Sequence, residues 1–170
     1  MQETAEEYRN RILGHLAGRD PLKLQAAAPQ RLDRLLKGLP ASKSRKRPAP
    51  EKWSIAEIVA HLADAELVIG YRIRTILGNP GAPVQAYDQD VWAAAMQYAN
   101  RNVRQSFAHY RALREANVAL LKSITPAQWK QHGLHAERGD ESIERIASLT
   151  AGHDLNHFQQ IERILAAKKR

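Results

Sequence analysis

Two histidines that lie four residues apart, His153 and His157, belong to the last long amphipathic segment of the chain. Apolar residues recur every three or four positions in this segment, which predicts a helix that buries one face. The residues on that face are Ile143, Ile146, Ala147, Thr150, His153, His157, Ile161, Ile164 and Leu165. Because imidazoles one turn apart project from the same side of a helix, His153 and His157 can bind a single metal ion.

A third histidine, His61, lies beside the apolar stripe of an earlier helical segment. A histidine on an apolar face is more often a hydrogen-bonded core residue, and the four-residue spacing alone arises by chance. Three buried imidazoles, however, need partners for all their ring nitrogens, and one metal ion would bind three of these. Three protein ligands leave a position open for water or substrate, which favours a catalytic metal site over a structural one. The other histidines fall in short helices, on an exposed face or in a polar loop and are expected not to be ligands: His15, His109, His132 and His135.

Two residues that follow His61 are candidates for supporting roles. Asp64 lies one turn further along and can accept a hydrogen bond from a ligating ring, although an exposed helical aspartate is the alternative. Arg72 can bind an anionic group of a substrate, although it can equally be a surface arginine. Asp154 points away from the face of His153 and is expected to meet solvent or another helix. The sequence identifies no catalytic residue.

The length of 170 residues predicts a single domain over residues 1–170. The chain has no cysteine, so it forms no disulfide or thiolate metal site, and this weakly favours a reducing compartment. Its first seven residues are acidic and lack the apolar run of a secretory signal. No apolar stretch approaches the roughly 18 residues of a membrane span. We therefore expect a cytoplasmic protein that does not associate with a membrane.

A net charge of +8 raises the possibility of a nucleic-acid partner. Two clusters of basic residues lie in residues 43–47 and 168–170, without interleaved aromatic residues. Such clusters are more typical of a solvated loop and a frayed end than of a shaped groove, so a nucleic-acid partner is not expected. A basic helical module that binds nucleic acid or a protein, with a structural or vestigial metal, stays open as the alternative function.

The pattern of apolar residues predicts an all-α protein, a four-helix bundle with short satellite helices and no strand. Expected helices cover residues 4–17, 30–38, 54–77, 90–100, 103–123, a short stretch after 125, and 141–167. Residues 41–50 read as a flexible basic connection and residues 132–140 as a polar loop. Ser54 with Glu57, and Thr125 with Gln128, have the spacing of a capping box at a helix start.

Several motifs resemble the DinB-like (damage-inducible) superfamily of four-helix bundle proteins, and in particular its YfiT-like branch. Residues 53–66 are similar to the family's opening motif around the first histidine, and residues 152–161 to its closing motif. Residues 87–92 resemble the Tyr-Asp-x-x-x-Trp element of the branch, and residues 135–139 its polar loop. Two features depart from the family pattern: Asn156, where many relatives have a further histidine, and the basic segment 43–50.

This resemblance implies that His61, His153 and His157 bind one divalent transition metal, with nickel and zinc the expected ions. Imidazole ligands alone do not distinguish these two metals. The YfiT-like branch includes bacillithiol S-transferase and metal-dependent hydrolases, which implies a thiol S-transferase or a small-molecule hydrolase. The expected substrate is a small molecule, with a low-molecular-weight thiol as one candidate. A homodimer is also implied.

Overall fold

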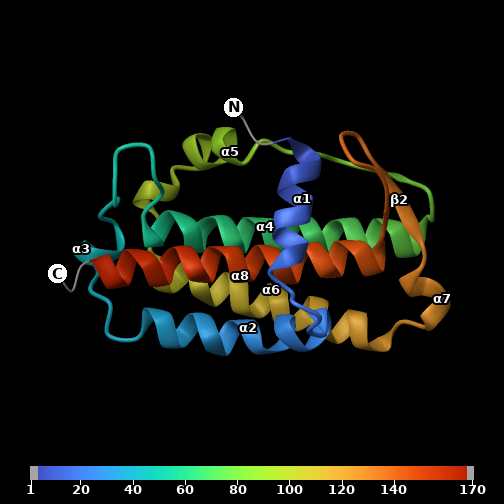
Figure 1. The fold of residues 1–170 in the computed structure, drawn as a ribbon, viewed down its shortest axis with the longest axis horizontal. Helices are drawn as coiled ribbons and strands as arrows, with labels where there is room; N and C mark the ends of the chain where they lie inside the picture. Colours follow the sequence, from blue (N-terminus) through green and yellow to red (C-terminus); the bar gives the residue numbers. More distant parts are fainter. Residues whose placement is uncertain (1–3, 168–170) are drawn as a thin grey trace.

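Four long helices lie side by side and form a bundle (Figure 1). The computed structural model describes residues 4–167 of the chain. The bundle helices are α2 (Pro21–Leu36), α4 (Ile55–Gly78), α6 (Val103–Ser123) and α8 (Ile143–Ala167). Around the bundle α4 contacts α6, α6 contacts α2, α2 contacts α8, and α8 contacts α4. The predicted four-helix bundle is confirmed.

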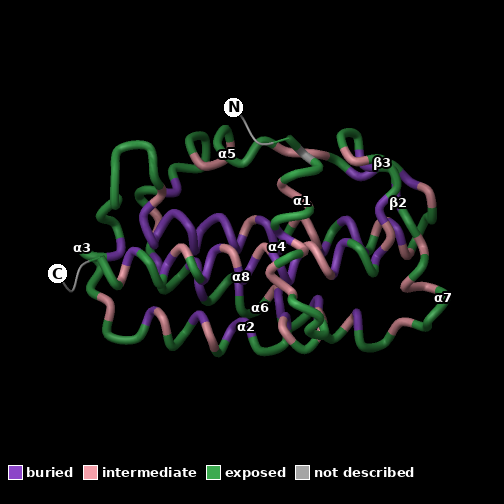
Figure 2. The backbone as a smooth tube through the Cα atoms, in the orientation of Figure 1, coloured by how far each residue is buried: buried purple, intermediate pink, exposed green. Residues whose placement is uncertain are grey.

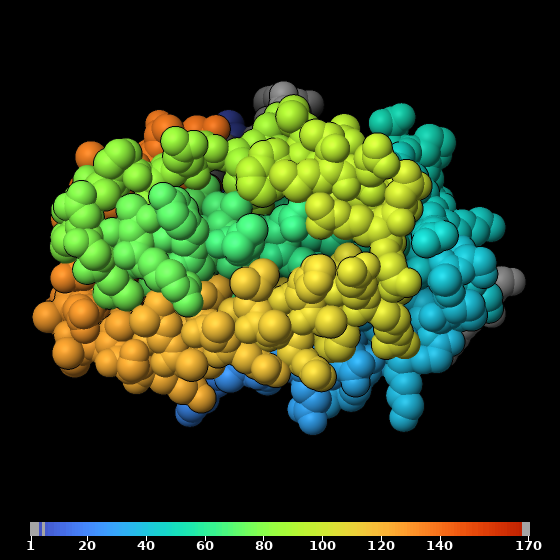
Figure 3. Space-filling view, turned by 180° about the vertical axis from the view of Figure 1, so that it is seen from behind, coloured from blue at the N-terminus to red at the C-terminus, as the bar shows by residue number. Residues whose placement is uncertain are grey.

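The facing sides of these helices form the apolar core, and the buried parts of α4 and α8 run along most of their length (Figure 2). Near the start of α4 the core includes Ile55, Ile58 and Leu62, which pack with Phe158 and Ile161 of α8. Burying a side chain of this size contributes about 1.5–3 kcal/mol. Seen from behind, α4 and α6 lie next to each other across the molecule (Figure 3). Between residues 4 and 167, no helix combines the length and apolarity needed to cross a bilayer.

The start of α4 is fixed by the capping box that the sequence predicts. The Ser54 hydroxyl accepts a hydrogen bond from the Glu57 amide at 3.3 Å, and the Glu57 carboxylate accepts one from the Ser54 amide at 2.8 Å. The same arrangement of Thr125 and Gln128 starts the short helix α7 (Pro126–Trp129). Both caps satisfy amides that would otherwise lack partners at the helix end.

The predicted start of the second bundle helix, after Pro29, is wrong. Helix α2 begins at Pro21, because Asp20 caps it: its carboxylate accepts hydrogen bonds from the amides of Leu22 and Lys23 at 2.8 and 3.2 Å. Pro29 lies inside the helix and is buried against the bundle. Burial of the apolar face of α2 therefore outweighs the hydrogen bond that an interior proline removes.

The basic connection over residues 41–50 is more structured than expected. It contains the short helix α3 (Ala41–Ser44), and the Arg47 guanidinium forms an ion pair with the buried Glu57 carboxylate. Burial alone would raise the pKa of Glu57, but hydrogen bonds from Arg47 and Ser54 lower it below its usual value. One of the basic residues in this segment thus stabilises the start of α4.

The polar loop expected over residues 132–140 is instead a β-hairpin. Strands β2 (His132–His135) and β3 (Gly139–Ser142) pair antiparallel, and β1 (Pro83–Val84) pairs parallel with β2. Strands this short carry too little alternation to be recognised in a sequence. A side chain at Gly133 would lie 2.9 Å from the Ala82 carbonyl oxygen, so glycine permits β2 to approach β1.

The satellite elements are shorter than predicted. They are α1 (Ala5–Gly14), α5 (Gln89–Ala95) and the 3-10 turn η1 (Tyr98–Asn100). Helix α1 lies across the bundle on α8, and α5 lies beside the N-terminal half of α4 (Figure 1). These elements and the hairpin form a second layer over α4 and α8.

Helix α1 packs on α8 at Gly152, where only a glycine leaves room. A Cβ atom at this position would lie 2.2 Å from the carbonyl oxygen of Ile12. We expect Gly152→Ala to lower the free energy of unfolding by about 1–3 kcal/mol, because the backbone of α1 must move away. Hydrogen exchange of the α1 amides should accelerate in the same variant. Gly14→Ala, where a Cβ meets no atom within 4 Å, should be neutral or slightly stabilising; equal effects of both changes would contradict the close packing.

Candidate metal centre

The side chains of His61, His153 and His157 converge in the interior of the bundle. Nε2 of His153 lies 3.0 Å from Nε2 of His61 and 3.1 Å from Nε2 of His157. His61 comes from α4, and the other two come from successive turns of α8. Between residues 4 and 167, no other His, Cys, Asp or Glu joins this group of potential ligands. The three histidines singled out in the sequence are therefore brought together in space.

The spacing of the three nitrogens fits one transition-metal ion. Metal–imidazole bonds are about 2.0–2.1 Å long, so ligands at octahedral or tetrahedral angles lie about 2.9–3.4 Å apart. The separations of Nε2 of His153 from the other two nitrogens, 3.0 and 3.1 Å, fall within this interval, and the ligand atoms of all three histidines lie within 4.8 Å of one another. The donor set is all imidazole, which suits zinc, nickel, copper or iron.

A hydrogen bond fixes the orientation of the His157 ring. Its Nδ1 lies 3.0 Å from Oε1 of Gln160, one turn further along α8. An amide oxygen only accepts hydrogen bonds, so Nδ1 carries the proton and Nε2 keeps its lone pair for the metal. Nδ1 of His61, by contrast, has no hydrogen-bond partner among the described residues.

Burial keeps the three imidazoles neutral. It lowers the pKa of His157 to about 4. The pKa values of His61 and His153 lie well below the usual value, first because of burial and then because of the neighbouring imidazoles. Neutral imidazole is the form that binds metal, so burial in the bundle favours the protonation state that metal binding requires.

Trp53 packs against the triad from the start of α4. Its ring is stacked with that of His157 at a centroid distance of 6.5 Å and lies 5.0 Å from that of His61. This contact shields one side of the histidine cluster. It also places an indole where its fluorescence should respond to a bound transition metal.

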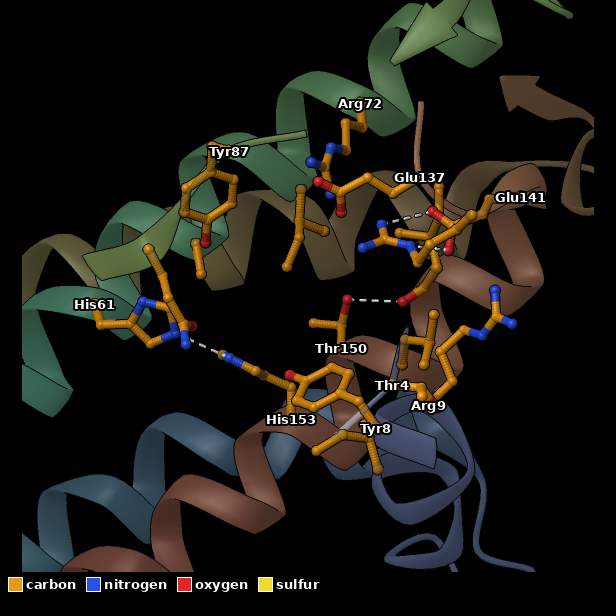
Figure 4. A pocket seen from close by; sticks show the side chains of 17 residues that line it. Thr4, Tyr8, Arg9, His61, Arg72, Tyr87, Glu137, Glu141, Thr150 and His153 are labelled. Carbon is orange, nitrogen blue, oxygen red and sulfur yellow. Dashed lines mark hydrogen bonds and ion pairs between the residues drawn. The ribbon is translucent and has the colours of Figure 1, made fainter. Parts of the chain in front are cut away.

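The opposite side of the cluster opens into a cavity of about 440 Å³ (Figure 4). This volume suits a small molecule. His61 and His153 line one part of the cavity, while Arg72, Glu137 and Glu141 lie at the other end. Its wall is completed by α1, α4, α8, the hairpin and the segment around Tyr87. An ion held by the three histidines would therefore present its open side to a ligand.

The structure also shows the surroundings of the three other residues that the sequence singled out. Asp64 binds Arg101, whose Nη1 lies 3.1 Å from each carboxylate oxygen, and not the ring of His61. The expectation that Asp64 orients His61 is not supported by these contacts. Arg72 is a buried residue that lines the cavity, not a surface arginine. Asp154 forms the helix–helix pair that was one of its two expected arrangements.

Sequence reasoning missed a buried charged cluster beside the three histidines. Arg114 of α6 binds Asp154 of α8 and Glu66 of α4, and Asn117 also donates to Glu66 at 2.8 Å. No sequence signal links these residues, because they are on three helices and far apart in the chain. Gln160, in contrast, lies three residues after His157, and that spacing on a helix indicates a contact.

A family model of the DinB superfamily matches residues 25–161. The chain belongs to the DinB superfamily. This DinB-like chain also has relatives named provisionally as metal-dependent hydrolases, and they place it in the YfiT-like branch. One from Oceanobacillus iheyensis is 24% identical over 68% of this chain and 67% of its own length. One from Halalkalibacterium halodurans is 25% identical over 83% of this chain and 82% of its own length.

YfiT of Bacillus subtilis links the sequence and structure comparisons. It is 24% identical over 64% of this chain and 62% of its own length. Its solved structure, described as that of a "probable metal-dependent hydrolase with an unusual four-helix bundle topology", superposes with a TM-score of 0.77. The match covers 97% of this DinB-like chain and 91% of YfiT at 18% sequence identity, so it establishes the shared fold.

Acid should release a bound metal only well below the pH at which exposed histidine titrates. Protons compete with metal for imidazole, and an exposed imidazole has a pKa of about 6.5. Because burial lowers the pKa of His157 to about 4, we expect affinity to be constant from neutral pH to about pH 5 and to fall near pH 4. Zinc titrations at successive pH values, with circular dichroism to confirm folding, measure this. A midpoint near pH 6.5 would show that the site is solvated.

Proposed function

We propose that this protein is an enzyme in which His61, His153 and His157 bind one divalent transition metal, nickel or zinc. The observation that carries this proposal is the convergence of three Nε2 atoms at a cavity of about 440 Å³. A structural metal site would be closed by a fourth ligand, whereas three ligands beside a cavity are typical of catalytic sites. The expected substrate is a small molecule bound in that cavity.

A divalent ion in this position would supply Lewis-acid chemistry, activating a water or a thiol or polarising a carbonyl group. The residues around it would orient the substrate and exclude water. Tyr87 points into the cavity (Figure 4). Burial raises the pKa of Tyr87 to about 12, so its hydroxyl keeps its proton and can donate a hydrogen bond to a negatively charged atom.

Two reactions fit this site. Hydrolysis is supported by the names of the relatives. Thiol transfer is favoured by the position of the carboxylates: Glu137 and Glu141 lie at the far end of the cavity from His61 and His153 (Figure 4). Activating a water usually requires a nearby general base, whereas a thiol loses its proton more easily.

In a thiol transfer the sulfur forms a bond to an electrophilic carbon, and the bond from that carbon to its leaving group breaks. The leaving group departs with the electron pair, and the thiol proton passes to solvent.

An activity screen with metal-free and metal-reloaded protein tests the proposal. One assay measures conjugation of small thiols to an alkyl halide dye, and the other measures hydrolysis of small esters and amides. Turnover in either assay should disappear on chelation and return with zinc or nickel. His132→Ala, a change on the exposed side of the hairpin, serves as the control and should keep this activity. Absence of metal-dependent turnover together with tight DNA binding at physiological salt would favour the binding-module alternative.

A further inference from the structure

Arg72 is a buried cation without a matching anion. Only 8% of the residue is exposed, and it lines the cavity of the metal centre. Its Nη2 donates a hydrogen bond to the backbone carbonyl of Gln85. Within the described chain no carboxylate forms an ion pair with it, and its Nε has no hydrogen-bond partner.

Two other arginines of the protein that are enclosed have carboxylate partners. Arg138 binds Glu141 through two hydrogen bonds of 2.6 and 2.8 Å, and Arg114 binds two carboxylates. Burying an unpaired charge is costly, and a guanidinium does not lose its proton. Burial and the nearby Arg138 lower the pKa of Arg72, and the more distant charges of Glu141 and Glu137 offset this only in part. A ligand that brings a negative charge would remove this cost.

The charged side chains that line the cavity include one more cation than anions. The described lining includes the three arginines Arg9, Arg72 and Arg138 and the two glutamates Glu137 and Glu141. Because the histidines are neutral, the protein lining alone has an excess of one positive charge, to which a divalent metal ion at the histidines would add. A carboxylate beside Arg72 would balance the excess of the protein lining, and a guanidinium binds a carboxylate through two parallel hydrogen bonds.

The position of Arg72 relative to the metal centre sets the shape of the ligand. Arg72 follows His61 by eleven residues on α4, which is about three helical turns, so the two residues lie on one face with their Cα atoms about 16 Å apart along the axis. Ala65 and Ile69 lie between them and line the same cavity, as does Ile146 of α8. In Figure 4 Tyr87 lies between His61 and Arg72. An apolar floor thus separates the two polar ends.

We propose that the cavity binds an elongated small molecule whose carboxylate pairs with Arg72 while its reacting group lies at the metal centre. The apolar middle of the molecule contacts Ala65, Ile69 and Ile146. Arg72 is then a specificity residue that selects acids over neutral analogues. The metal end of this inference rests on the proposed function, and the carboxylate end rests on Arg72 alone.

Cobalt-loaded protein and two matched thiols test the inference. Mercaptohexanoate and mercaptohexanol share a thiol and an alkyl chain and differ in the terminal carboxylate. Their dissociation constants can be measured from the cobalt–thiolate absorption band. We expect the carboxylate to tighten binding by about 10- to 100-fold, as a charge-assisted hydrogen bond does. Arg72→Gln should abolish this difference and leave the affinity for mercaptohexanol unchanged.

Controls separate this inference from a general charge effect and from failure of the metal site. Arg111→Gln, on the exposed side of α6, should keep the preference for the acid. Mercaptopropionate, which is too short to span the two ends, should show no gain over mercaptopropanol. Equal binding of the six-carbon probes to the unmodified protein would overturn the carboxylate site, even if Arg72→Gln did not fold. If neither thiol binds cobalt, the proposed metal function fails, and calorimetry with hexanoate and hexanol still decides the role of Arg72.

Discussion

Replacing His157 with alanine is expected to weaken binding of a divalent metal by more than about 100-fold. Loss of a hydrogen bond to a ligand typically costs 10- to 100-fold, and loss of the ligand itself removes one of only three donors. Calorimetric titration of untagged, metal-free protein with zinc or nickel measures the change. Quenching of Trp53 fluorescence provides a second signal, because its ring is stacked with that of His157.

Two further variants should show a smaller loss of metal affinity or none. His132→Ala should retain the affinity of the unmodified protein, because His132 is exposed on β2. Gln160→Leu removes the acceptor that orients His157 and should reduce affinity by about 10- to 100-fold. Undiminished affinity in His157→Ala would rule out the three-histidine site.

Replacing Arg114 with methionine should lower the free energy of unfolding of the metal-free protein by about 3–5 kcal/mol. Removing one member of a buried ion pair leaves its partner charged in an apolar environment. Here two carboxylates, Asp154 and Glu66, would lose their shared cation, while Arg114 itself is 1% exposed. Chemical denaturation followed by circular dichroism measures the loss.

Arg111→Met is the matched control on the same helix. Arg111 is exposed and lies 3.8 Å from Glu115, so the change should alter stability by no more than about 0.5 kcal/mol. A loss below about 1 kcal/mol in Arg114→Met would mean that water reaches the cluster. A protein that no longer folds would agree with the upper end of the expected loss.

The helices that position the metal centre could be predicted because their signals are local. The capping box of Ser54 and Glu57 defines the start of α4, and the spacing of His153 and His157 follows from the period of one helix. Nothing in the spacing fixes the contact between α4 and α8, so joining His61 to these two residues depended on the need of three buried imidazoles for partners and on a resemblance to a known family.

The remaining features depend on tertiary contacts. Pro29 reads as a helix breaker, yet burial against the bundle keeps it inside α2. The hairpin forms from short polar strands that α4 and β1 hold in place. Asp64 is close to His61 in sequence, but Arg101 competes for its carboxylate. No feature of the sequence indicates that Arg72 is buried without a carboxylate partner, because this depends on the residues that surround it in the fold.

Anomalous X-ray diffraction from crystals of untagged protein loaded with zinc or nickel tests the central claim most directly. We expect one strong peak at the metal's absorption edge, about 2.0–2.1 Å from Nε2 of His61, His153 and His157. Its remaining coordination positions should face the cavity that Arg72 lines. A peak elsewhere in the molecule, or a fourth protein ligand that closes the site, would contradict a catalytic three-histidine centre.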